Sequence, residues 1–111
     1  MRILQIIAAI GTMVTGLVSL FWPRSVRGFT GLSAEDGRGI TEIRSILGGV
    51  FVALGAAPLI LNAAAAYQTL GITYLVVGVI RAVSMFVDKS VVQSNVISLV
   101  VEIAFGIMLV L

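Results

Sequence analysis

Two charged residues, Arg81 and Glu102, lie inside long apolar stretches of the sequence. A charge at the centre of a bilayer costs about 2.5–3.5 kcal/mol on insertion scales, so such a residue normally faces a partner or water. A carboxylate in this setting could exchange a proton or bind a solute, tuned by the arginine. The pair could instead be structural and fix the packing of two helices. We favour the structural role and keep the functional one as the alternative.

Helical rise places the two charges at depths that differ by about the length of an extended arginine side chain. Glu102 stands eleven residues into the last apolar stretch, about 16 Å from its start. Arg81 stands six residues before the end of the preceding stretch, about 9 Å from the same face. Because only Asp88-Lys89-Ser90 separates the stretches, their helices must be neighbours, and we predict an Arg81–Glu102 salt bridge. The predicted intramembrane charge cluster adds two residues near the start of the second helix, Glu42 and Arg44.

Small and polar residues recur at helical spacing and predict the faces on which the helices pack. One such stripe on the last helix consists of Asn95, Ser98, Glu102 and Gly106. A stripe with seven-residue spacing on the helix before it consists of Tyr67, Tyr74, Arg81 and Asp88. On the second helix a ladder of small residues, which would let another backbone approach closely, consists of Ser45, Gly49, Ala53 and Ala57.

The elements that carry these residues are predicted to be membrane-spanning helices. Hydrophobic residues make up 59% of the chain and charged residues 11%, whereas soluble domains average about 25% charged. Each of four stretches is close to the ~20 apolar residues that a span needs: Ile3–Trp22, Ile43–Leu61, Thr69–Val87 and Val91–Leu111. Ser90 with Gln93 predicts a capping box for the last one. We expect an all-α integral membrane protein, with residues 1–111 forming one domain of two antiparallel hairpins.

Missing residue types exclude several kinds of chemistry. The chain has no His and no Cys, which excludes the common zinc sites, histidine-ligated haem, thiol nucleophiles and Ser-His-Asp hydrolysis. We therefore expect no enzymatic activity, no metal and no cofactor. The net charge is only +2 and the basic residues form no run, so nucleic acid is not an expected partner.

Two segments of the chain resemble each other. VSLFWPRSV at residues 18–26 and VSMFVDKSV at residues 83–91 share five of nine letters. Each includes the end of an odd-numbered predicted helix and the start of the polar turn after it. The halves Ile3–Leu61 and Thr69–Leu111 could therefore be a duplication related by an axis along the membrane normal. Chance recurrence of common apolar residues is the alternative explanation.

A longer motif, EIRSILGGVFVALG at residues 42–55, carries a resemblance to a known family. Its features are an acidic residue, an arginine two positions on, a glycine pair and a further glycine, here Glu42, Arg44, Gly48-Gly49 and Gly55. In this layout the chain resembles the bacterial four-helix membrane family catalogued as domain of unknown function 4345. The resemblance implies the fold and supplies no mechanism.

The basic residues predict an orientation in the membrane. The side that holds the first and third connections carries Arg24, Arg27, Arg38, Arg44 and Lys89, and the other side carries Arg2. The positive-inside rule assigns the richer side to the cytoplasm. We expect a multi-pass protein of the bacterial cytoplasmic (inner) membrane with both termini non-cytoplasmic.

Two functions fit these observations. The favoured one is a structural or accessory subunit that packs against other membrane proteins or associates with itself, because soluble loops and catalytic residue types are scarce. The alternative is a small-solute or proton-coupled carrier that uses Glu102 as its coupling carboxylate. A large stoichiometric complex in mild detergent would favour the first, and a homodimer with pH-dependent ligand binding would favour the second.

Overall fold

The computed structural model describes residues 2–26 and 36–111, and within these ranges the chain is helical without strands. The elements are α1 (Arg2–Phe21), the 3-10 helix η1 (Pro23–Val26), α3 (Gly37–Glu42), the π-helical η2 (Ile43–Val50), α4 (Phe51–Leu61), α5 (Ala64–Val87) and α6 (Gln93–Val110). Four helices of the described chain are long and apolar enough to cross a membrane: Ile3–Phe21, Gly37–Leu61, Ala64–Val87 and Gln93–Val110.

The second and third spans begin earlier than the sequence predicted. The second starts at Gly37 rather than Ile43, and the side chain of Asp36 caps it by accepting a 2.9 Å hydrogen bond from the Gly39 amide. The third starts at Ala64 rather than Thr69. Alanine has the highest helix propensity, so the alanines that precede Tyr67 continue the helix instead of forming a turn.

The predicted capping box at the last helix is wrong. α6 begins at Gln93, its N-cap is Val92, and no side chain caps it. Ser90 belongs to the turn before it, where its amide donates to the Met85 carbonyl at 2.9 Å and its carbonyl accepts from the Val92 amide at 2.8 Å. The turn therefore uses the backbone of Ser90 and leaves it too far from the helix start to act as a cap.

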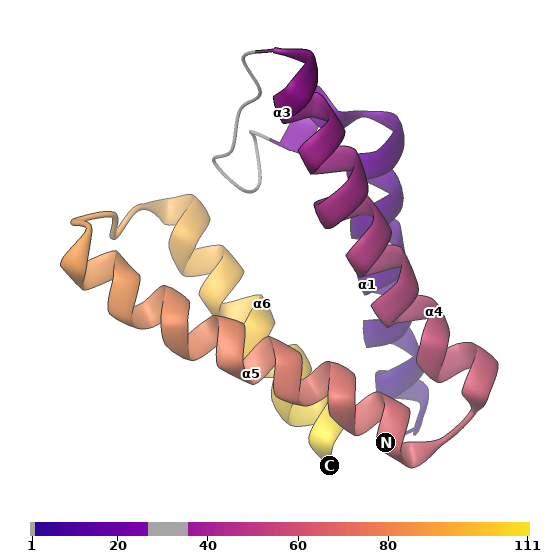
Figure 1. Ribbon diagram of the computed structural model, residues 1–111. Coiled ribbons are helices and arrows are strands. Elements are labelled where there is room, and N and C mark those ends of the chain that lie inside the picture. The colour runs from indigo at the N-terminus through magenta and orange to yellow at the C-terminus, as the bar shows by residue number, and fades with distance from the viewer. Residues whose placement is uncertain (1, 27–35) are drawn as a thin grey trace.

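The spans form two pairs, α1 with η2 and α4, and α5 with α6 (Figure 1). The pairs meet at the end that holds both chain termini and diverge towards α3 and the α5–α6 turn (Figure 1). The shape is flat, with extents of 39 × 30 × 16 Å.

Glycines hold the first pair together at close range. A Cβ on Gly16 of α1 would lie 2.6 Å from the Val52 amide nitrogen, and a Cβ on Gly55 of α4 would lie 2.6 Å from the Ala9 carbonyl oxygen. Only glycine fits at these two contacts. Without a hydrophobic force between helices in lipid, such close backbone approach supplies the packing that holds spans together.

The ladder predicted on the second span does not lie at this contact. Ser45, Gly49 and Ala53 are exposed, Ala57 is half-buried, and a Cβ on Gly49 would meet nothing within 4 Å. Other residues of this span pack against α1: Gly48 faces Leu20, and Gly55 faces Ala9 and Met13. The predicted ladder therefore lies on a face that α1 leaves uncovered.

The pairs contact each other around a small core, against which residues of α4 also pack. Its buried residues come from α1, α5 and α6 and are Ala8, Ala9, Tyr67, Leu70 and Leu109. Beside it, the hydroxyls of Thr12 and Tyr74 share a hydrogen bond. Nearer the N-terminus, Gln5 Nε2 donates to the Leu109 carbonyl at 3.4 Å. The contact between pairs thus uses the first half of α1 and leaves its second half free to diverge.

The internal duplication stays a prediction. Phe21 and Phe86, the equivalent aromatic residues of the two similar segments, are both exposed at the ends of their helices. The segments continue differently, because Pro23–Val26 forms a 3-10 helix whereas Asp88 and Lys89 form a turn.

Candidate functional site

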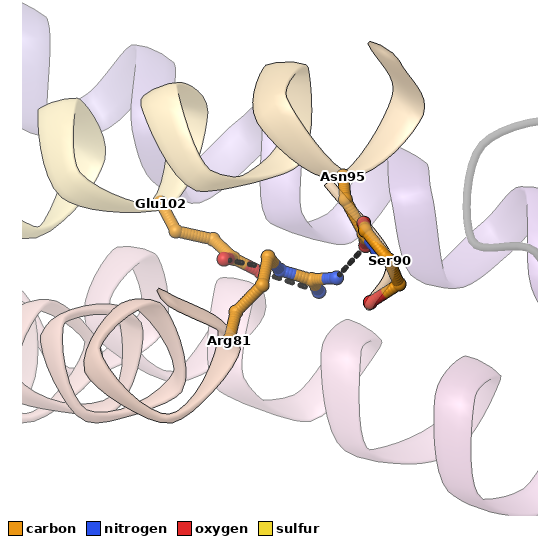
Figure 2. Close-up of polar contacts among 4 residues, drawn as sticks. All are labelled: Arg81, Ser90, Asn95 and Glu102. Carbon is orange, nitrogen blue, oxygen red and sulfur yellow. Dashed lines mark hydrogen bonds and ion pairs between the residues drawn. The ribbon is translucent and has the colours of Figure 1, made fainter. Parts of the chain in front are cut away.

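The ion pair predicted from helical rise is present. Arg81 Nε lies 2.7 Å from Glu102 Oε1, and Arg81 Nη2 lies 2.9 Å from Glu102 Oε2 (Figure 2). The two parallel bonds make a bidentate pair, the strong arrangement for an arginine and a carboxylate. The connection between α5 and α6 covers only Asp88–Val92, which keeps the two residues on neighbouring helices.

Asn95 extends the pair towards the turn. Its Oδ1 accepts a 2.9 Å hydrogen bond from Arg81 Nη1, and its Nδ2 donates at 2.8 Å to the Ser90 carbonyl (Figure 2). All three guanidinium nitrogens of Arg81 are therefore engaged. Asn95 stood on the predicted stripe of α6 but was not predicted as a partner of the charges, because spacing alone does not give the direction of an amide.

The pair is largely removed from the surface. The side chain of Glu102 is 11% exposed and that of Arg81 is 28% exposed. A charge buried to this degree is tolerated when it is paired and hydrogen-bonded, and here each charge neutralises the other. The remaining stripe residues agree with this placement, since Gly106 is buried and Ser98 half-buried.

A cleft of about 590 Å³ lies between the two helix pairs and includes the ion pair in its wall. From α5 and α6 the lining comprises Tyr74, Val77, Arg81, Ser94, Ile97, Ser98, Val101, Glu102 and Phe105. From α1, η2 and α4 it comprises Thr15, Ser19, Leu47 and Phe51. On α1 these residues follow Ala8, Ala9 and Thr12, so the cleft begins where the contact between the pairs ends.

A smaller cavity of about 290 Å³ reaches Arg81 from the side of the turn. Its lining includes Ser84, Ser90 and Asn95, with Arg81 common to both cavities. The arginine therefore stands between the cleft and a second space near the α5–α6 turn. Its network with Asn95 and Ser90 forms a polar path from the buried carboxylate to the end of the helix pair.

The other two members of the predicted charge cluster lie elsewhere. Glu42 is exposed and forms an ion pair with Arg38, one helical turn before it, and Arg44 is exposed as well. Neither lines the cleft. They belong to the first helix pair, which diverges from α5 and α6 towards this end, so shared depth did not bring them close to Arg81 (Figure 1).

Sequence reasoning missed the hydroxyl groups that α1 contributes to the cleft. Thr15 Oγ1 donates to the Gly11 carbonyl at 2.9 Å, and Ser19 Oγ donates to the Thr15 carbonyl at 3.0 Å. A hydroxyl that bonds its own helix in this way gives no sequence signal beyond an isolated Ser or Thr in an apolar run. Their four-residue spacing was the one available sign that they share a face.

These features define a class: an all-helical protein with four described helices suited to span a membrane and a cleft between two helix pairs. The chain belongs to the family described as Domain of unknown function (DUF4345), whose family model matches residues 1–111, the whole chain. No curated protein and no solved structure matches the chain.

Proposed function

We propose that this protein is a multi-pass membrane protein that binds a small ligand in the cleft and acts as a small-solute carrier. The observation that supports this is the cleft itself, with its single ion pair, between two helix pairs. Ligand sites are typically concavities of about 300–1,000 Å³ with mainly apolar walls and a few converging polar groups. The cleft agrees in both respects.

The arrangement of the pairs suits alternating access. Many carriers place their site near the bilayer midplane between two bundles, and transport by rocking one bundle against the other. Here we propose that the pairs are two antiparallel hairpins in the cytoplasmic membrane. The small core around Leu70 and Leu109 would act as the pivot, since the pairs meet there and diverge beyond it. In this proposal Glu102 is the coupling carboxylate.

Proton uptake by Glu102 gives coupling a physical basis. The ionised carboxylate accepts two hydrogen bonds from Arg81. Protonation would remove the negative charge and with it most of the attraction that holds the guanidinium, because charge-assisted bonds are about twice as strong as neutral ones. The arginine would then be available to hydroxyl oxygens that line the cleft, such as that of Ser19.

The decisive experiment fills the cleft. Val101 lines it, whereas the neighbouring Val100 is exposed and does not. Protein purified from its native membrane should carry a bound small molecule, detected by mass spectrometry after extraction. We expect Val101→Trp to lose this molecule and Val100→Trp to keep it. Equal recovery from both variants, or none from the wild type, would contradict the proposal.

A second candidate is the accessory subunit that the sequence favoured first. The specific observation behind it is that Ser45, Gly49 and Ala53 leave a strip of small residues uncovered on the second span. In an assembly, a helix of another subunit could approach closely there. Gly49→Leu should then dissolve a stoichiometric complex isolated in mild detergent, whereas Val101→Trp should leave that complex intact.

The proposed orientation puts the end at which the helix pairs diverge on the cytoplasmic side. η1, α3 and the α5–α6 turn, which carry Arg24, Arg38 and Lys89, lie away from the end that holds the termini (Figure 1). The predicted contribution of Arg27 lies outside the described residues. In intact cells, Ala64→Cys should react with an impermeant maleimide and Gly37→Cys should not. The opposite labelling pattern would reverse the orientation.

A further inference from the structure

We propose that the ligand of the cleft is an uncharged single-chain amphiphile that enters from the bilayer, with hydroxyl or amide groups in its head. The inference rests on the proposed function, because it names the class of molecule that the same cleft would take. Four properties of the described lining carry it: balanced charge, hydroxyl groups, apolar walls that reach the surface, and volume.

The charge of the lining is balanced by the lining itself. Arg81 and Glu102 are its two charged side chains, and their bidentate bonds engage both carboxylate oxygens. Arg81 gives its remaining terminal nitrogen to Asn95. An anionic head group would have to displace Glu102 and strand its charge, and a cationic one would have to displace Arg81, each a costly exchange in a buried site. An uncharged head group needs neither exchange.

Hydroxyl groups supply the polar contacts that such a head group needs. Ser94 and Ser98 of α6 line one side of the cleft, and Thr15 and Ser19 of α1 line another. The two α1 hydroxyls donate hydrogen bonds to backbone carbonyls, but each oxygen keeps a lone pair that can accept a hydrogen bond. These two oxygens can therefore accept a hydrogen bond from the ligand. A hydroxyl or an amide can donate one, whereas a quaternary ammonium or a sulfonate cannot.

The apolar part of the lining is accessible from outside the protein, because the cleft is open rather than enclosed. Val77, Ile97 and Val101 line the cleft and yet stay 39%, 55% and 41% exposed. A membrane around these helices would reach the same side chains, so a molecule dissolved in lipid can enter sideways between the helix pairs.

The volume limits the size of the ligand. About 590 Å³ falls in the range typical of sites for drug-sized molecules. One acyl chain with a small head is of this size, whereas a two-chain phospholipid is much larger than a drug. The cleft therefore suits a single chain lying against the apolar walls, with its head near Ser98 and the ion pair.

The test compares three probes that share a twelve-carbon chain: monolauroylglycerol, dodecylsulfonate and dodecyltrimethylammonium. The chain has no cysteine, so Ile97→Cys can carry a single environment-sensitive fluorophore in the cleft. With the labelled protein in nanodiscs and the probes at low mole fraction, we expect monolauroylglycerol to shift the emission with at least tenfold tighter binding than either charged probe. Ser98→Ala should weaken this binding about threefold to tenfold, as expected for one lost hydrogen bond.

Two controls separate the class of ligand from the existence of the site. A fluorophore at Ile60→Cys, an exposed residue of α4 outside the cleft, should not respond to any probe. Adding Val101→Trp to the reporter protein should abolish the response to monolauroylglycerol.

If a charged probe binds as tightly or more tightly, and Val101→Trp abolishes that binding, the uncharged class is overturned while the proposed site stands. If no probe gives a response that Val101→Trp removes, the amphiphile inference is overturned, and the extraction experiment on the same variant decides the proposed function independently.

Discussion

The two helix pairs share an architecture but are held together by different means. α1 and the second span meet through glycines, Gly16 and Gly55, whose backbones touch the facing helix. α5 and α6 also have close glycines, such as Gly71, but add a bidentate ion pair between Arg81 and Glu102. Both solutions suit lipid, where burial of apolar side chains gives helices little reason to associate. Among the side chains that the structure describes, the second pair is the one that carries charge inside the protein.

The two pairs also contribute different polar groups to the cleft. The first pair contributes the hydroxyls of Thr15 and Ser19, and the second contributes the ion pair. The short connection Asp88–Val92 keeps α5 and α6 in fixed register, which a bidentate contact requires. A helix pair that packs through glycines has no charged side chains that must be aligned in this way. We therefore expect substitutions in the two pairs to fail in different ways.

The largest effect should come from breaking the ion pair on one side. Arg81→Leu leaves Glu102 buried without its partner, and such a loss costs about 3–5 kcal/mol. The double variant Arg81→Leu with Glu102→Leu should recover most of this stability, since an apolar replacement of both partners is often neutral. Reversible unfolding in mixed micelles measures both. The matched control is Arg44→Leu, which removes an exposed arginine. If Arg81→Leu is as stable as the wild type, the ion pair contributes nothing to stability.

The next effect should come from the glycine contact of the first pair. Gly55→Ala puts a methyl group against the backbone of Ala9 and Met13, at 2.6–2.7 Å, and overpacking of this kind costs about 1–3 kcal/mol. Gly49→Ala in the same span should be neutral or slightly stabilising, because its added Cβ meets nothing. Equal losses in the two variants would mean that the second span packs through the predicted ladder after all.

A smaller effect should follow from removing the amide that anchors Arg81. Asn95→Leu takes away one hydrogen bond to the guanidinium and one to the Ser90 carbonyl, and interhelical polar contacts in membranes are worth about 0.6–1.7 kcal/mol. Because Glu102 still holds Arg81, the loss should be well below that of Arg81→Leu. A loss as large as that of Arg81→Leu would make the amide, rather than the carboxylate, the main partner. Ser94→Leu, at the preceding residue of α6, is the control: it also replaces a polar side chain by leucine but removes no hydrogen bond to Arg81.

The sequence predicted the four spans and the ion pair because both follow from simple periodicities. An apolar run of the right length marks a span, and helical rise with a short connection fixes the depth of Arg81 against Glu102. The packing face of the second span could not be found in this way. Its ladder of Ser45, Gly49 and Ala53 marks a stripe of small residues, but spacing alone does not say which stripe faces α1. Gly48 and Gly55 are the glycines that do. The cleft depends on how the pairs diverge, which no single-helix pattern encodes.

The smallest predicted effect tests the contact that joins the two pairs. Thr12 on α1 is buried, and its hydroxyl shares a hydrogen bond with that of Tyr74 on α5. Thr12→Val keeps the shape of the side chain and removes this bond, as Tyr74→Phe does from the other side. A double-mutant cycle should give a coupling energy of about 0.6 kcal/mol, the average for such contacts in a membrane protein.

Thr12→Val should also leave the Arg81–Glu102 coupling unchanged, because that pair lies wholly within α5 and α6. No coupling between Thr12 and Tyr74 would mean that this pair of hydroxyls does not help to join the helix pairs. A changed Arg81–Glu102 coupling would mean that the two pairs do not behave as independent units.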